Sequence, residues 1–156
     1  MPVLEELARQ SDERFLAIYE SLAQNGFGPL DGEVAKALKF RPQAIRKLPM
    51  AKRAKQARAI IGRASNTELC YEVFGTYLVT NHKELVTTFL DETGVEHEDG
   101  IIQDLDSVPD EAKIEATVAK LDESFDQEDV TLYLALAAEQ WDHSEKLQAL
   151  WSARGA

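Results

Sequence analysis

The sequence predicts an all-α fold, a compact bundle of about six or seven helices that includes antiparallel helical hairpins. Apolar residues recur at spacings of three and four over most of the chain, which indicates amphipathic helices. Sustained alternation of apolar and polar residues, the pattern of strands, is nearly absent. The length of 156 residues, with 44% apolar and 29% charged side chains, is typical of one globular domain. We therefore expect a single helical domain over residues 1–156, with a short solenoid of stacked hairpins as the alternative.

The first predicted helix occupies most of the first 25 residues. Its apolar face is formed by five residues at helical spacing: Leu4, Leu7, Phe15, Ile18 and Leu22. Asn25 and Gly26 favour the left-handed cap of a helix, so we expect the helix to end there. Asp31 can cap a short second helix, and Pro42 suits the first turn of another that Pro49 interrupts.

A basic helix follows over residues 50–61, with Gly62 as its end, and two capping patterns mark the helices after it. Residues 65–68 read Ser-Asn-Thr-Glu, a capping box, and residues 81–84 repeat the pattern as Asn-His-Lys-Glu. The gap between the two helices that they begin is short, so we expect these helices to pack as a hairpin. Gly94 is expected to end the second one.

The C-terminal third contains an acidic connection followed by two helices. The connection, residues 95–108, carries a small apolar cluster of Ile101, Ile102 and Leu105. Pro109 fits the start of the next helix, whose apolar stripe consists of Ile114, Val118, Leu121 and Phe125. Asp126 can cap the last helix, expected over about residues 128–151. Its first half is apolar on nearly all sides, which predicts a central place in the core.

Charge is distributed unevenly along the chain, whose net charge is −11. Residues 1–64 contain 12 Lys and Arg against 7 Asp and Glu, whereas residues 65–156 contain 5 against 21. Residues 36–63 hold ten basic side chains and no acidic one. This separation is the most unusual property of the sequence and the main pointer to function.

The basic segment is a candidate binding site for an anion or an acidic partner. The residues selected for it are Lys47, Lys52, Arg53, Lys55 and Arg58, preceded by further cations at Lys36, Lys39, Arg41 and Arg46. A nucleic-acid binder needs such a cluster to neutralise phosphates, but Phe40 is the only aromatic residue in the segment. A membrane-surface helix would need a stronger apolar face than alanine provides. A solvated helix, or one that packs against acidic surface of its own chain or a partner subunit, is the favoured interpretation.

No metal or cofactor site is predicted. Residues 91–100 are rich in carboxylates, but neither Gly94 nor Gly100 gives an EF-hand register, because the first ligand position would be apolar. Glu139 and His143 share a helix face, yet one such pair supplies only two ligands. Glycine-rich phosphate loops and nucleophile elbows are also absent from the sequence.

Cys70 is the only cysteine, so an internal disulfide is excluded, and its apolar helix face predicts a buried, unreactive thiol. Trp141 and Trp151 are expected to close the core rather than anchor a partner. The first residues do not resemble a signal peptide, and the longest apolar stretch is far shorter than the roughly 20 residues of a membrane span. These features predict a cytoplasmic protein without a membrane association.

Three classes of function remain. The first is a non-enzymatic interaction or regulatory module that acts through charge-segregated helix faces, with a protein partner or homo-oligomer. The second is a binder of nucleic acid or another polyanion through residues 36–63. The third is an enzyme with a carboxylate-based site in the acidic C-terminal half, which would require a concave pocket with several polar groups. The absence of catalytic motifs favours the first class.

Overall fold

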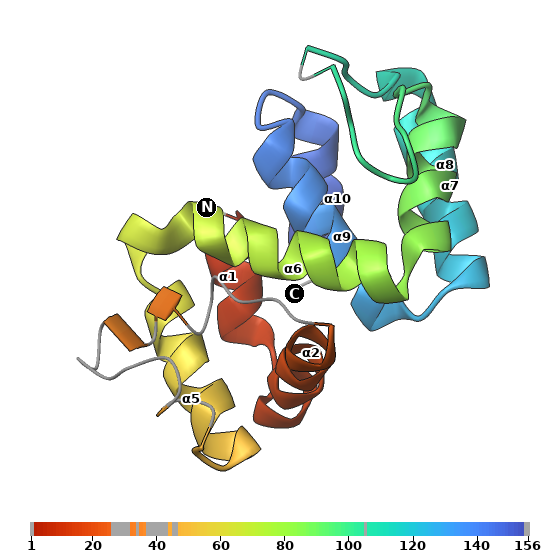
Figure 1. Ribbon diagram of the computed structural model, residues 1–156. Helices are drawn as coiled ribbons and strands as arrows, with labels where there is room; N and C mark the ends of the chain where they lie inside the picture. Colours follow the sequence, from red (N-terminus) through yellow and green to blue (C-terminus); the bar gives the residue numbers. More distant parts are fainter. Residues whose placement is uncertain are drawn as a thin grey trace. The chain divides into compact units, whose positions relative to one another are not determined.

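The computed structural model describes residues 2–25, 47–104 and 106–154, together with the isolated positions 32, 33, 35, 36 and 44. Over these residues the chain is all-α, as predicted: it contains eight α-helices, one 3-10 helix and no strand (Figure 1). The helices are α1 (Pro2–Arg9), α2 (Asp12–Gln24), α5 (Met50–Ile61), α6 (Thr67–Asn81), α7 (Lys83–Thr93), α8 (Glu111–Ser124), α9 (Gln127–Gln140) and α10 (Glu145–Arg154), with the 3-10 helix η1 (Ala64–Asn66) before α6. The two short helices predicted after Asp31 and Pro42 fall largely outside the described residues.

The described part has more helices than predicted because two of the predicted helices are divided. The first breaks at Ser11, whose Oγ accepts a hydrogen bond from the backbone N–H of Arg14 at 3.1 Å and so caps a new helix, α2. The last breaks after Trp141, whose backbone leaves the helical region at φ −110° and ψ 61°. Ser144 then caps α10, since its Oγ accepts from Leu147 N–H at 3.3 Å. In both cases a serine that offers a cap competes with continuation of the helix.

Several predicted helix ends are confirmed and two starts are displaced. Asn25 and Gly62 end their helices, and Gly94 ends α7 in the left-handed conformation at φ 79°. Asp126 caps α9 by accepting from Glu128 N–H at 2.8 Å. The box predicted at residues 65–68 is instead occupied largely by the single 3-10 turn of η1, and His82 rather than the preceding asparagine is the N-cap of α7.

The chain divides into two compact units, which are described separately: unit 1 is essentially Val3–Tyr77 and unit 2 is essentially Leu78–Ala156. The boundary falls inside α6, which continues from Tyr77 to Leu78 without a break. In unit 1, α2 packs along α5. Its core contains Phe15, Ile18, Leu22, Ala54, Ala57, Ile60, Ile61, Val73 and Phe74, all nearly or completely buried.

The core of unit 2 is built around α9. This helix buries seven consecutive residues, 132–138, which confirms the central place predicted for it. Helix α10 packs on α9 as a short-looped hairpin, and α8 contacts α7, α9 and α10 (Figure 1). The hairpin therefore forms at the end of the chain, whereas α7, predicted to pair with the helix before it, packs along α8.

Aromatic rings complete the core of unit 2. The ring of Phe89 meets Tyr133 edge-on at 5.0 Å between centroids and stacks near Trp141 at 6.2 Å. Trp141 and Trp151 are both 3% exposed, so the prediction that they close the core is confirmed. None of the described helices is long and apolar enough to span a bilayer.

Candidate functional site

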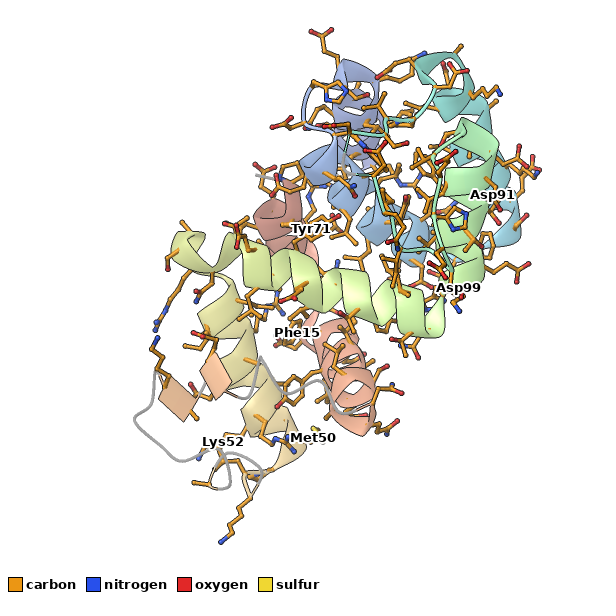
Figure 2. All side chains as sticks on the ribbon, turned by 45° about the horizontal axis from the view of Figure 1, so that its top comes forward. Phe15, Met50, Lys52, Tyr71, Asp91 and Asp99 are labelled. Atoms are coloured by element: carbon orange, nitrogen blue, oxygen red, sulfur yellow. The ribbon has the colours of Figure 1, made fainter. Side chains whose placement is uncertain are left out.

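The residues predicted to bind an anion fall into two groups in unit 1. Lys47 lies just before α5 and is exposed, as are Lys52 and Lys55 on the helix itself. Arg53 is half-buried instead, with its guanidinium 5.5 Å from the centre of the Tyr19 ring. Figure 2 shows Lys52 on the outer side of α5. The preceding cations at positions 39, 41 and 46 lie outside the described residues.

Arg58 ties α5 to the junction between α1 and α2. Its Nη2 donates to the carbonyl oxygens of Leu7 at 3.0 Å and Gln10 at 2.6 Å, at the end of α1 where carbonyls lack helical partners. Its Nη1 lies 3.2 Å from Asp12 Oδ1, and its guanidinium lies 5.8 Å from the centre of the Phe15 ring. The side chain thus closes one helix and packs on the next. Its donors are directed at the protein itself.

A groove of about 350 Å³ runs between α2 and α5. Its apolar lining consists of Phe15, Leu16, Ala51 and Ala54. Lys55 and Arg58 form the rim on α5, and Asp12 and Glu13 form the rim on α2. Unit 1 therefore presents an apolar channel with Lys55 on one side and Glu13 on the other, while Arg58 and Asp12 pair with each other. Periodicity alone could not reveal it, because a groove depends on how two helices separated by 25 residues pack.

The acidic connection of unit 2, residues 94–110, is here called the acidic loop, and the structure describes all of it except residue 105. It contains six Asp and Glu and no Lys or Arg. Its start is fixed by Gly94 and its end by Asp110, whose N–H donates to the carbonyl of Thr93 at 2.8 Å. Between them the indole N–H of Trp141 donates to the carbonyl of Ser107 at 3.0 Å. The loop is thereby tied to α7 and to the aromatic core.

The tip of the acidic loop is a tight turn over Glu98, Asp99, Gly100 and Ile101. The outer residues exchange two backbone hydrogen bonds, at 2.8 and 3.0 Å. The inner two have positive φ, 53° for Asp99 and 88° for Gly100. This is the geometry of a type I′ turn, for which Asp-Gly is a preferred pair. The pair was present in the sequence, but the helical interpretation of the chain overlooked it.

His97 holds this turn against α7. Its Nε2 lies 2.6 Å from Asp91 Oδ1, and its Nδ1 accepts the backbone N–H of Gly100 at 3.0 Å. Because Nδ1 accepts a hydrogen bond, the neutral ring carries its hydrogen on Nε2, and this N–H donates a hydrogen bond to Asp91. Figure 2 labels Asp91 on α7 and Asp99 at the turn. Both ring nitrogens are occupied by these contacts, which leaves neither in a position to act as a general base.

Two aliphatic side chains project from the acidic loop into solvent. Ile101 is 57% exposed and Val108 is 51% exposed, and they are the most exposed large apolar residues in the described part of the chain. An open hollow of about 660 Å³ is lined by Asp91 of α7 and by loop residues that include Glu96 and Gln103, but not by these two side chains. Single exposed aliphatic residues are common on protein surfaces; these two share one loop with six carboxylates.

The remaining candidate groups do not form a chemical site. His82 Nε2 lies 3.4 Å from Asp129 Oδ2 in unit 2, and His143 is exposed. Cys70 is fully buried, with its thiol 3.8 Å from the Val3 carbonyl, which confirms the prediction of a buried thiol. Within the described residues, no group of three or more His, Cys, Asp and Glu is arranged to hold a metal ion.

Comparison with known proteins adds no identification: no family model, no curated protein and no solved structure matches the chain.

Proposed function

We propose that this chain is a non-enzymatic interaction module that binds a cationic segment of a protein partner through the acidic loop. The observation that carries the proposal is the exposure of Ile101 and Val108 on a loop with six carboxylates and no cation. Carboxylates around such a loop attract a basic partner and orient it, and the aliphatic side chains supply apolar area for burial. We expect the protein to act in the cytoplasm.

The anchoring of the acidic loop supports this proposal. Contacts made by His97, Trp141 and Asp110 fix the loop before any partner arrives. A loop that is already ordered loses less conformational entropy on binding than a flexible one does. Its backbone is therefore arranged in advance to present the two aliphatic side chains.

The test is binding of a fluorescent 12-residue peptide of alternating lysine and leucine, measured by anisotropy at about 50 and 200 mM salt. We expect binding that weakens at the higher salt concentration. Ile101→Ser should weaken it by roughly tenfold, since burial of an isoleucine contributes about 1.5–3 kcal/mol and part of that is lost. The matched control is Glu123→Gln, which removes an exposed carboxylate from α8, outside the loop. Equal affinity of the wild type and Ile101→Ser would contradict the proposal.

Polyanion binding by the basic segment is the second candidate. It is supported by the exposure of Lys47, Lys52 and Lys55, while Arg53 and Arg58 already have partners within unit 1. Three phosphate contacts would make duplex DNA binding roughly 40-fold weaker at 200 than at 50 mM salt. Anisotropy with mixed-sequence RNA and duplex DNA measures this slope. Loss of binding in Lys52→Glu/Lys55→Glu would favour this candidate.

An enzyme with a carboxylate-based site has less support. The hollow beside the acidic loop is open to solvent, and the histidine next to it uses both ring nitrogens in structural contacts. Catalytic carboxylates usually work in a pocket that excludes water.

A further inference from the structure

The groove between α2 and α5 has no function in the proposal above. Its floor is apolar, with Phe15 and Leu16 from α2 and Ala51 from α5. Lys55 stands on its α5 rim, and Lys52 is exposed one turn earlier on the same helix. An occupant that fits must carry an aliphatic side chain with carboxylates on one side of it.

The acidic loop has this composition. Ile101 projects from the tip of its turn, and the exposed carboxylates of Glu96, Glu98 and Asp99 precede it within five residues. Lys83 Nζ lies 3.9 Å from Asp99 Oδ1, which partly offsets the charge of that carboxylate. The chain thus contains a groove and an element with complementary charge and apolarity.

We infer that the groove of one copy binds the acidic loop of a second copy, with Ile101 on the apolar floor, and Glu96 and Glu98 near Lys55 on the rim and the exposed Lys52 outside it. This inference rests on the proposed function and specifies the partner. The rims set the orientation: Asp12 is already paired with Arg58, Glu13 on α2 repels carboxylates, and Lys55 on α5 attracts them.

Each copy carries both this groove and this loop, so the contact joins two different surfaces. Such contacts either close into a symmetric pair or extend into a chain of copies. The contact surface is small, and part of its free energy comes from exposed charges. We therefore expect weak, reversible association that salt suppresses.

The experiment is sedimentation velocity of the full chain over about 5–500 μM. At about 50 mM salt the weight-average mass of the wild type should rise with concentration, and at about 500 mM it should stay near the monomer mass. A loop variant, Glu96→Lys/Glu98→Lys, and a groove variant, Lys52→Glu/Lys55→Glu, should each lose the concentration dependence.

The decisive sample is the equimolar mixture of these two variants. The loop variant keeps a wild-type groove, which can bind the wild-type loop of the groove variant. Its lysine-bearing loop also matches the glutamate-bearing groove of the groove variant. Association should therefore return in the mixture. Lys113→Glu, at an exposed lysine of α8, is the matched control and should associate as the wild type does.

A wild type that stays monomeric at all concentrations and low salt overturns the inference, as does a mixture that fails to associate. In that case the lysine–leucine peptide separates the two proposals. Binding of the peptide that depends on Ile101 would leave the proposed function intact with a different partner. Absence of both self-association and peptide binding would overturn the two together.

Discussion

The two units use their charged side chains in opposite ways. In unit 1, both arginines of α5 lie against the protein itself: Arg53 on the ring of Tyr19 and Arg58 on the carbonyls that end α1. Unit 2 contains 19 Asp and Glu but only 5 Lys and Arg. Two arginines therefore contribute to packing in unit 1, whereas unit 2 has a large excess of carboxylates over the cations that could pair with them.

This comparison shows why a count of charges overstates a binding surface. Guanidinium groups are planar, weakly hydrated and able to stack on rings, so an arginine can serve as a packing residue. Ammonium groups are strongly hydrated and remain at the surface. Of the five residues predicted to bind an anion, the three lysines are exposed and the two arginines are engaged.

The largest expected effect concerns the aromatic core of unit 2. Phe89→Ala removes a fully buried ring that contacts Tyr133 and Trp141, and should lower the free energy of unfolding by about 3–5 kcal/mol. Urea unfolding followed by circular dichroism measures it. Ile101→Ala, at an exposed aliphatic residue of the same unit, is the control and should change stability by less than about 0.5 kcal/mol.

The same titration tests the prediction of one domain. Both tryptophans of the chain lie in unit 2, so tryptophan fluorescence reports on that unit while circular dichroism reports on both. Because α6 continues through the boundary, we expect the two signals to coincide in the wild type and in Phe89→Ala. A dichroism phase that Phe89→Ala leaves unchanged would show two independently unfolding domains.

The second largest expected loss of stability concerns Arg154, an arginine of unit 2 that also lies against its own unit. Arg154 makes two hydrogen bonds to Asp122, at 2.7 and 2.8 Å, and donates to Thr131 Oγ1 at 2.7 Å. Arg154→Ala should cost about 2–3 kcal/mol, since these charge-assisted bonds join α10 to α8 and α9. Lys120→Ala, which removes an exposed ion pair with Glu92, should cost about 0–1 kcal/mol. Equal losses in thermal unfolding would contradict this ranking.

In unit 1, Arg58→Ala should destabilise by about 2 kcal/mol, because the Gln10 carbonyl loses the arginine donor, the Leu7 carbonyl keeps only the N–H of Gln10, and the Phe15 ring loses packing. Arg58→Lys should recover little of this, since a single ammonium cannot reproduce the fork of donors. Lys55→Ala, one turn earlier and exposed, is the matched control. Chemical denaturation that ranks Lys55→Ala as the more damaging change would refute a packing role for Arg58.

Much of the fold follows from local signals in the sequence. Helical spacing located the helices, and Gly94 and Asp126 marked ends that the structure confirms. The divisions at Ser11 and Ser144 were missed because apolar spacing continues across them, while the competing signal is a single serine hydroxyl. Local patterns thus located the helical segments but not the points where two of them divide.

The surfaces were less predictable than the helices. The basic segment could be found from composition, but the role of Arg58 depends on carbonyls 48 and 51 residues away in the chain. The exposure of Ile101 was equally hidden, because the sequence does not tell which residue of its apolar cluster faces solvent. Tertiary contacts decide which charged or apolar residue remains at the surface, and one sequence does not contain them explicitly.

The smallest expected effect isolates the turn that presents the acidic loop. Gly100 has φ 88°, where a Cβ strains the backbone, so Gly100→Ala should destabilise by about 1 kcal/mol. Gly75 lies inside α6, and a Cβ there meets no atom within 4 Å, so Gly75→Ala should stabilise by about 0.5–1 kcal/mol. Urea unfolding should show that the free energy of unfolding falls in Gly100→Ala and rises in Gly75→Ala. If the turn presents Ile101, Gly100→Ala should also weaken binding of the lysine–leucine peptide. Gly75→Ala, the control, should leave the affinity unchanged. Unchanged affinity in both variants would show that the geometry of the turn does not matter for docking.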